Sequence, residues 1–128
     1  MSYYFNKIAA LDFDEAVRRT TEALKQEGFG VLTDIDVQET LRKKLGVGFR
    51  RYRILGACNP TFAYEALQRE NKIGTMLPCN VVLQETEDHR VDIAAIDPVA
   101  SMMAIDNPAL ERTAQEVRAR LQRVIASL

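Results

Sequence analysis

Two cysteines stand out for their chemistry, because each precedes an asparagine and each lies where an ordered element begins or ends. Cys58 lies in the stretch ILGACNPTFAYEAL, and Cys79 lies in LPCNVVL. A thiol in such a place can act as a nucleophile or as a ligand for a soft metal ion. Cys58 directly precedes Asn59-Pro60, a pair typical of a helix start, since asparagine caps the first turn and proline fits within it. The helix dipole favours negative charge at that end, so Cys58 is the stronger candidate for a reactive thiolate.

Both cysteines also have a purely structural explanation. Cysteine is among the residue types most often buried, and Cys58 follows the small residues Gly56 and Ala57. Asn80, after Cys79, can close an Asx turn where the chain enters a strand. The spacing of the two cysteines is too long for a thioredoxin-like dithiol or a zinc knuckle. If the strands that carry them are parallel, the two thiols lie at opposite ends of the sheet, and if these strands are antiparallel, both thiols lie at the same end. The sequence leaves both arrangements open.

Other sulfur and imidazole groups are weaker candidates. Met102 and Met103 are soft ligands that can join the thiols in holding a cuprous ion, although methionines are also adaptable residues of cores and dimer interfaces. The candidate soft-metal ligands are therefore Cys58, Cys79 and Met102. His89, the one histidine of the chain, falls in the predicted hairpin turn TEDHR, where a solvated side chain is expected.

A basic run with interleaved aromatic residues gives the chain its one hint of an anion-binding surface. Its members are Arg42, Lys43, Lys44, Phe49, Arg50, Arg51, Tyr52 and Arg53. Strand alternation puts Arg51 and Arg53 on the same face as Leu55, so that they are either held by acidic partners or line the mouth of a pocket. The candidate ligand-binding residues are therefore Cys58, Asn59, Cys79, Asn80, Arg51 and Arg53.

Composition and charge describe an ordinary soluble globular protein. Of the 128 residues, 47% are apolar and 27% are charged, and the net charge is −1. Nothing in this balance draws the whole chain toward nucleic acid or an anionic membrane, and we expect neither as a partner. Residues 1–17 lack the layout of a secretory signal, and no window is apolar enough to span a membrane. We therefore expect a cytoplasmic protein with reduced cysteines and a single domain, residues 1–128.

Periodicity and capping signals divide the chain into five strands and four helices. Alternating apolar residues predict strands at 3–10, 29–37, 48–57, 79–86 and 91–97. Caps and three-and-four spacing predict helices at 13–27, 37–45, 61–71 and from Asn107-Pro108 to the C-terminus. The apolar stripe of the last helix fits packing on a sheet better than a coiled-coil seam.

The order β-α-β-α-β-α-β-β-α predicts an α+β fold. The final strand pair reads as a hairpin, so strict β-α alternation is lost. We expect a two-layer sandwich in which the helices lie on one face of a mixed or antiparallel sheet.

Three segments resemble a known family. YRILGACNP (residues 52–60), GTMLPCNVVL (74–83) and IDPVASM (96–102, with Met103 following) occur in the order found in domain-of-unknown-function family 302, a group of small bacterial and archaeal proteins. The resemblance covers nearly the whole chain and implies a compact α+β domain that forms homodimers. It implies no established activity, and it matches both Cys-Asn pairs to family motifs without making them catalytic. The occurrence of the family in some sulfur-oxidising prokaryotes favours a role in sulfur handling.

Two functions follow as hypotheses. The first is a small binding or carrier module with a thiol-containing site for a small ligand, persulfide sulfur or a soft metal. The second is a structural or protein-interaction domain whose cysteines only support the fold. Enzymatic activity stays uncertain, because no common catalytic motif is present and no base is well placed for Cys58. The sequence names no cofactor.

Overall fold

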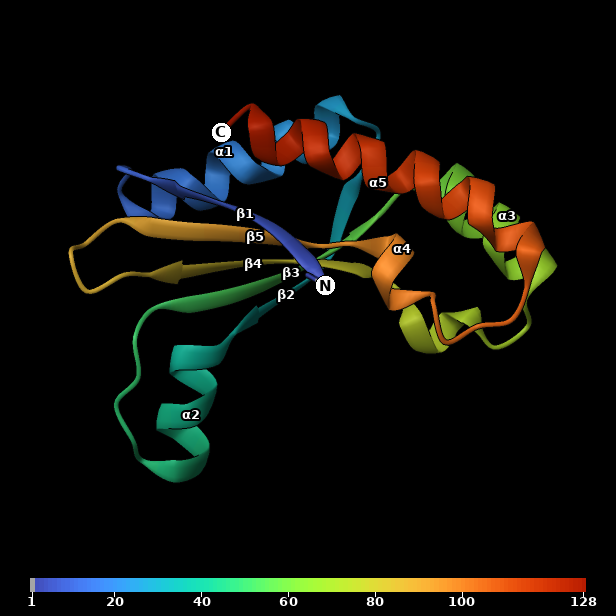
Figure 1. Ribbon diagram of the computed structural model, residues 1–128. Helices are drawn as coiled ribbons and strands as arrows, with labels where there is room; N and C mark the ends of the chain where they lie inside the picture. Colours follow the sequence, from blue (N-terminus) through green and yellow to red (C-terminus); the bar gives the residue numbers. More distant parts are fainter. Residues whose placement is uncertain (1) are drawn as a thin grey trace.

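A five-stranded antiparallel sheet forms the centre of the molecule in the computed structural model, which describes residues 2–128 (Figure 1). The strands lie in the order β1-β5-β4-β3-β2, and every neighbouring pair is antiparallel. Their bounds are β1 (Tyr4–Ala9), β2 (Gly30–Asp36), β3 (Tyr52–Cys58), β4 (Cys79–Glu85) and β5 (Val91–Ile96). The N-terminal strand therefore pairs with the last one, and the predicted hairpin of β4 and β5 is confirmed.

Helices α1 (Phe13–Gln26) and α5 (Glu111–Ala126) cover one face of this sheet, and α3 (Pro60–Arg69) packs beside α5 beyond the end of the strands (Figure 1). Helix α2 (Val37–Leu45) extends away on the other side of the sheet and contributes no buried residue. A short helix, α4 (Pro98–Ser101), and two 3₁₀ turns, Ile73–Met76 and Pro108–Leu110, complete the chain. The predicted α+β class and element order are confirmed, and α2 is the exception to the expectation that helices share one face.

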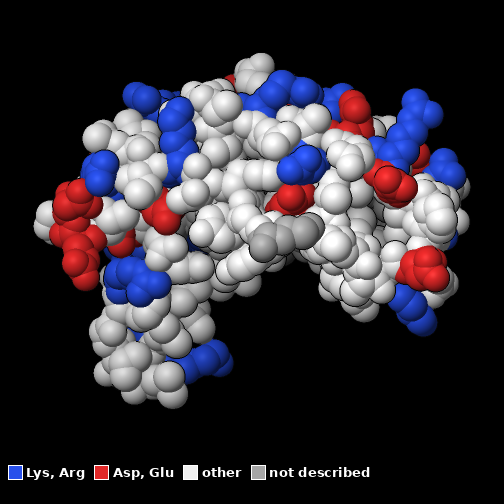
Figure 2. Space-filling model, viewed as in Figure 1, with Lys and Arg blue, Asp and Glu red and all other residues white. Residues whose placement is uncertain are grey.

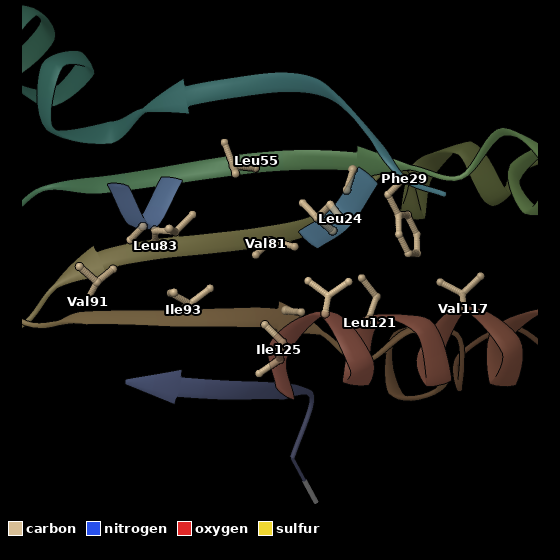
Figure 3. Close-up of a cluster of buried hydrophobic side chains, with 14 of the residues drawn as sticks. Leu24, Phe29, Leu55, Val81, Leu83, Val91, Ile93, Val117, Leu121 and Ile125 are labelled. Atoms are coloured by element: carbon tan, nitrogen blue, oxygen red, sulfur yellow. The ribbon is translucent and has the colours of Figure 1, made fainter. Parts of the chain in front are cut away.

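The core lies between the sheet and helices α1 and α5. On the covered face, neighbouring strands place apolar residues in register, as in the row Leu55, Val81 and Ala95. Leu24 of α1 and Leu121 of α5 pack onto these rows, and neither side chain is exposed (Figure 3). Each buried side chain of this size contributes about 1.5–3 kcal/mol, so this layer is the main source of stability. The stripe predicted on the last helix packs on the sheet, as expected.

Side-chain caps set the helix starts. Asp12 accepts a hydrogen bond from the backbone N–H of Glu15, and Asp36 accepts one from the N–H of Glu39. Both are the capping relations that the sequence predicts. Gly46 ends α2 in the left-handed conformation, with φ of 66°.

Two boundaries differ from expectation. Residues 48–51 are not part of β3, which begins at Tyr52. The turn after β5 is a short helix, because Asp97 accepts a hydrogen bond from the backbone N–H of Val99 at 3.0 Å and Pro98 occupies the first helical position.

Candidate functional site

The antiparallel pairing of β3 and β4 settles where the two cysteines lie. Ala57 stands opposite Cys79, and Cys58 stands opposite Gly30 of β2. Cys58 and Cys79 therefore lie at the same end of the sheet, on neighbouring strands and one position apart in register. This is the antiparallel alternative of the two that the sequence leaves open.

Helix α3 fixes the position of Cys58. The side-chain Oδ1 of Asn59 accepts a hydrogen bond from the backbone N–H of Phe62 at 3.5 Å, and its carbonyl accepts one from Ala63 at 2.9 Å. Pro60 takes the first helical position. As predicted, the chain therefore changes from strand to helix directly after Cys58, which places this thiol at the bend.

Gly56 joins the two cysteine motifs. A Cβ at this position would lie 2.1 Å from Oγ1 of Thr33 and 2.7 Å from Cγ of Pro78. Only glycine leaves room for this close approach, which brings the segment before Cys79 against β3. The glycine of GACNP and the proline of LPCN thus fit one another.

A pocket of about 280 Å³ opens at this end of the sheet. Both cysteines and Asn59 line it, together with residues from all three motif segments. Its other residues are Ala57, Leu77, Pro78, Pro98 and Met102 near the motifs, Phe29 and Leu32 around β2, Phe62, Ala63, Ala66 and Leu67 of α3, and Thr113, Ala114 and Val117 of α5. Among residues 2–128, no aspartate, glutamate, lysine or arginine lines this pocket. We call it the sulfur-lined pocket.

The third motif supplies one wall of the sulfur-lined pocket. Asp97 is buried and forms an ion pair with Arg118 of α5, with Nε 3.3 Å from Oδ2. This pair ties the end of β5 to α5, while Pro98 is fully buried against the pocket. Met102 follows directly after α4 and lines the pocket.

The surroundings keep the Cys79 thiol protonated. Burial among apolar groups and, to a lesser degree, the Coulombic interaction with Cys58 together raise the pKa of Cys79 to about 11. Part of the Cys79 surface is exposed, but this residue lines the apolar pocket, so desolvation outweighs that exposure. At neutral pH Cys79 presents a neutral, soft sulfur to the pocket.

The structure places the arginine candidates elsewhere. Arg51 forms an ion pair with Asp14 at 2.8 Å, and its guanidinium lies 4.3 Å from the ring centre of Phe13. Arg53 forms a two-point pair with Asp34, with Nε 2.7 Å from Oδ1. Of the two roles that the sequence leaves open for these arginines, the structure gives them acidic partners.

Asn80 and His89 also lie outside the sulfur-lined pocket. Asn80 belongs to the other face of the sheet, where it lines a shallow hollow with Tyr4 and Tyr52. His89 sits in the β4–β5 turn with φ of 60° and is exposed. The pocket therefore brings together Cys58, Asn59, Cys79 and Met102.

Sequence reasoning missed the apolar wall of the pocket. Leu32, Phe62 and Val117 come from segments whose patterns indicate only an ordinary core or strand, and Leu32 lies where the register of β2 shifts against β3. The irregular register has no clear sequence signal, which explains the omission.

The metal-binding potential of the site is limited to sulfur. Within the described residues 2–128, no group of three or more histidine, cysteine, aspartate or glutamate side chains gathers where it could hold a metal ion.

The same part of the chain contains no helix long and apolar enough to cross a membrane.

The fold and site define a small α+β domain with an open antiparallel sheet and an apolar pocket at one sheet end. The family model described as "Domain of unknown function DUF302" matches residues 5–128, so the chain belongs to the DUF302 family. A crystal structure of an uncharacterized conserved DUF302 protein from Bacillus stearothermophilus is similar, with a TM-score of 0.91 and 30% sequence identity over 98% of each chain. The curated proteins compared with the chain include no match.

Proposed function

We propose that the protein is a binding module for a small, uncharged and largely apolar molecule, which occupies the sulfur-lined pocket. The observation that carries this proposal is the absence, among residues 2–128, of any charged side chain in a pocket lined by both cysteines. Burying a charged guest without a partner would be costly, so such a wall selects neutral molecules. The volume of about 280 Å³ is close to the lower end of the range for ligand pockets, roughly 300–1,000 Å³, so the guest is small.

The rim of the pocket supports the same proposal. Leu32 and Leu67 both line the pocket, yet 68% and 47% of their surfaces are exposed. Large apolar side chains exposed next to a cavity gain from contact with an apolar guest, because its binding removes them from water. The Asn59 side chain, the two thiols and the Thr113 hydroxyl, which also donates to Glu65, are polar groups available to orient the guest.

A neutral fluorescent probe tests this function. We expect prodan, an uncharged naphthalene ketone whose emission shifts to the blue in apolar surroundings, to bind the wild-type protein at one site per chain. Ala63→Leu fills the pocket from α3 and should weaken binding by about 10-fold or more, since overfilling a packed site costs about 1–3 kcal/mol. Ala119→Leu on α5, outside the pocket, is the matched control.

Two outcomes would contradict the proposal. One is a wild-type protein that leaves the prodan emission unchanged. The other is equal binding by wild type and Ala63→Leu. Circular dichroism of each variant confirms that the fold is intact.

The uncovered face of the sheet favours a second candidate, self-association into a homodimer. Ile35, Ile54, Val82 and Ala94 stand in register across four strands on the face opposite α1 and α5. Ile35 is 48% exposed, and this face forms the underside of the arch in Figure 2, between α2 and the α4 end of the molecule. A continuous apolar row of this kind suits contact with another apolar surface.

In this candidate function the cysteines are structural and the sheet binds a second copy. Ile35→Lys should then shift the protein to monomers in analytical ultracentrifugation, while Thr21→Lys on the outer surface of α1 should not. Cys58→Ala should lower stability by about 1–2 kcal/mol and leave association intact. A wild-type protein that sediments as a monomer at all accessible concentrations would contradict self-association. Both functions presuppose the reducing conditions of the cytoplasm, where thiols stay free.

A further inference from the structure

Three sulfur-containing residues from distant parts of the chain line the sulfur-lined pocket. Cys58 ends β3, Cys79 begins β4, and Met102 follows α4. All three line the same cavity of about 280 Å³. The neighbouring Met103 does not line it and is 65% exposed. The fold therefore selects one of two adjacent methionines to stand with the two thiols.

The chemistry of this group of side chains is unusually uniform. Thiolates suit Cu(I), Zn²⁺ and Fe–S clusters, imidazoles suit Zn²⁺ and several other transition metals, and carboxylates and carbonyls suit Mg²⁺, Ca²⁺ and Mn²⁺. A thioether is a soft ligand for Cu(I) and is not among the usual ligands of Zn²⁺, so Met102 favours Cu(I). Within residues 2–128, no carboxylate or imidazole lines the pocket.

The pocket end can accommodate the charge of a Cu(I) complex. If both thiols bind as thiolates, each releases its proton to the buffer, and the complex with one monovalent cation carries a net charge of −1. The N-terminus of α3 begins directly after Cys58 and presents the positive end of its dipole there. The Arg120 guanidinium lies 5.2 Å from the ring centre of Phe62, which lines the pocket, but its charge is shared with Glu116, whose Oε1 lies 3.9 Å from Nε. The helix end is therefore the feature that stabilises one excess negative charge.

The two thiols also lie close enough to affect each other. The charge on Cys58 contributes to the raised pKa of Cys79, and a cation held between the sulfurs would reverse that effect. Their placement on adjacent strands, with Ala57 directly opposite Cys79, accounts for this coupling.

We propose that Cys58, Cys79 and Met102 form a binding site for one soft monovalent metal ion, Cu(I), on the wall of the sulfur-lined pocket. This inference rests on the same pocket as the proposed function, but it does not require an apolar guest. Copper stays Cu(I) throughout, and the thiols lose only protons.

Anaerobic competition with bicinchoninate tests the site directly. The reduced wild-type protein should withdraw one Cu(I) per chain from this chelator. Cys58→Ser and Cys79→Ser should each weaken Cu(I) binding by at least about 100-fold, since even outer-shell changes at metal sites cost 10–100-fold. Met102→Leu should weaken it by about 10-fold. Met103→Leu is the matched control and should bind as the wild type does.

The inference is overturned if the wild type withdraws no more Cu(I) than the Cys58→Ser/Cys79→Ser double variant. Equal affinity of Met102→Leu and Met103→Leu overturns the assignment of Met102. A measurement on the unaltered protein guards against misfolded variants: one equivalent of Cu(I) should protect both cysteines from iodoacetamide, as read by peptide mass spectrometry. Unchanged labelling of the wild type would also overturn the site.

The prodan titration separates the two proposals. Prodan binding without Cu(I) binding removes the metal site and leaves the binding module. Cu(I) binding without prodan binding removes the apolar guest and leaves the metal site.

Discussion

The polar groups at one end of strand β3 are charged and paired, whereas those at the other end are uncharged. At the Arg53 end the polar groups are charged and paired, since Arg53 and Asp34 form two contacts and Arg51 pairs with Asp14. At the Cys58 end, the described residues that line the pocket carry no charge, and its polar groups are the two thiols, the Asn59 amide and the Thr113 hydroxyl. The two ends lie on one short strand, and the apolar pocket opens at the second.

This difference shows where binding capacity is found in the fold. Paired charges satisfy one another and leave little for a ligand, whereas the sulfur-containing residues that line the apolar cavity have surface that a ligand can contact. In this chain, the charged candidates Arg51 and Arg53 form ion pairs that stabilise the fold. The candidate site lies where charge is absent.

The largest expected effect comes from disturbing the close packing at the Cys58 end. Gly56→Ala should lower the free energy of unfolding by about 3 kcal/mol or more, because its Cβ would overlap both Thr33 and Pro78. Urea denaturation measures the loss. Gly48→Ala is the control, since a Cβ there meets nothing within 4 Å. Adding Thr33→Ala to Gly56→Ala should recover part of the stability, and equal stability of the two single glycine variants would contradict the packing argument.

A smaller effect concerns the protonation of Cys79. Its pKa is about 11 in the folded protein against an ordinary value of 9.0, so the folded state holds the thiol proton more tightly than the unfolded state does. Stability is therefore unaffected below pH 9 and falls as the pH rises from 9 through 11. Wild type should lose about 2 kcal/mol over this interval relative to Cys79→Ala, which has no thiol to titrate. Guanidinium denaturation at several pH values measures this difference, and parallel curves for the two proteins would argue against a buried neutral thiol.

The smallest effect is expected at the charged end of β3. Asp34→Asn removes the partner of Arg53, whose side chain is only 22% exposed, and should cost about 1 kcal/mol. Asp88→Asn breaks a more exposed pair with Arg90 in the β4–β5 turn and should cost less. Thermal unfolding compares the two variants. Neither substitution should change prodan or Cu(I) binding. A loss of prodan or Cu(I) binding in Asp34→Asn would contradict the distinction drawn between the two ends of β3.

Local signals in the sequence specify most of the fold. Asp12, Asp36 and Asn59 each cap the helix that the sequence predicts, because capping depends on residues within one turn. Alternation along β5 likewise places Val91, Ile93 and Ala95 on the buried face. These features depend on near neighbours, which a single sequence displays.

The site depends on contacts that a single sequence does not display. The pairing of Cys79 with Ala57 follows from the direction of β4, which hydrogen bonds between distant segments decide. The partners of Arg51 and Arg53 lie on α1 and β2, and no spacing rule links them. The sequence therefore identifies the two thiols and leaves open whether they meet.

The pairing of β1 with β5 has a consequence for the order of events during synthesis. Tyr4 lies opposite Ile96, so the first strand made waits for the fifth before it has a neighbour in the sheet. Thr113, Ala114 and Val117, which close the sulfur-lined pocket, are made later still. The pocket is thus complete only after residues 113–117 have left the ribosome, and a bound guest would favour chains that have folded this far over shorter ones.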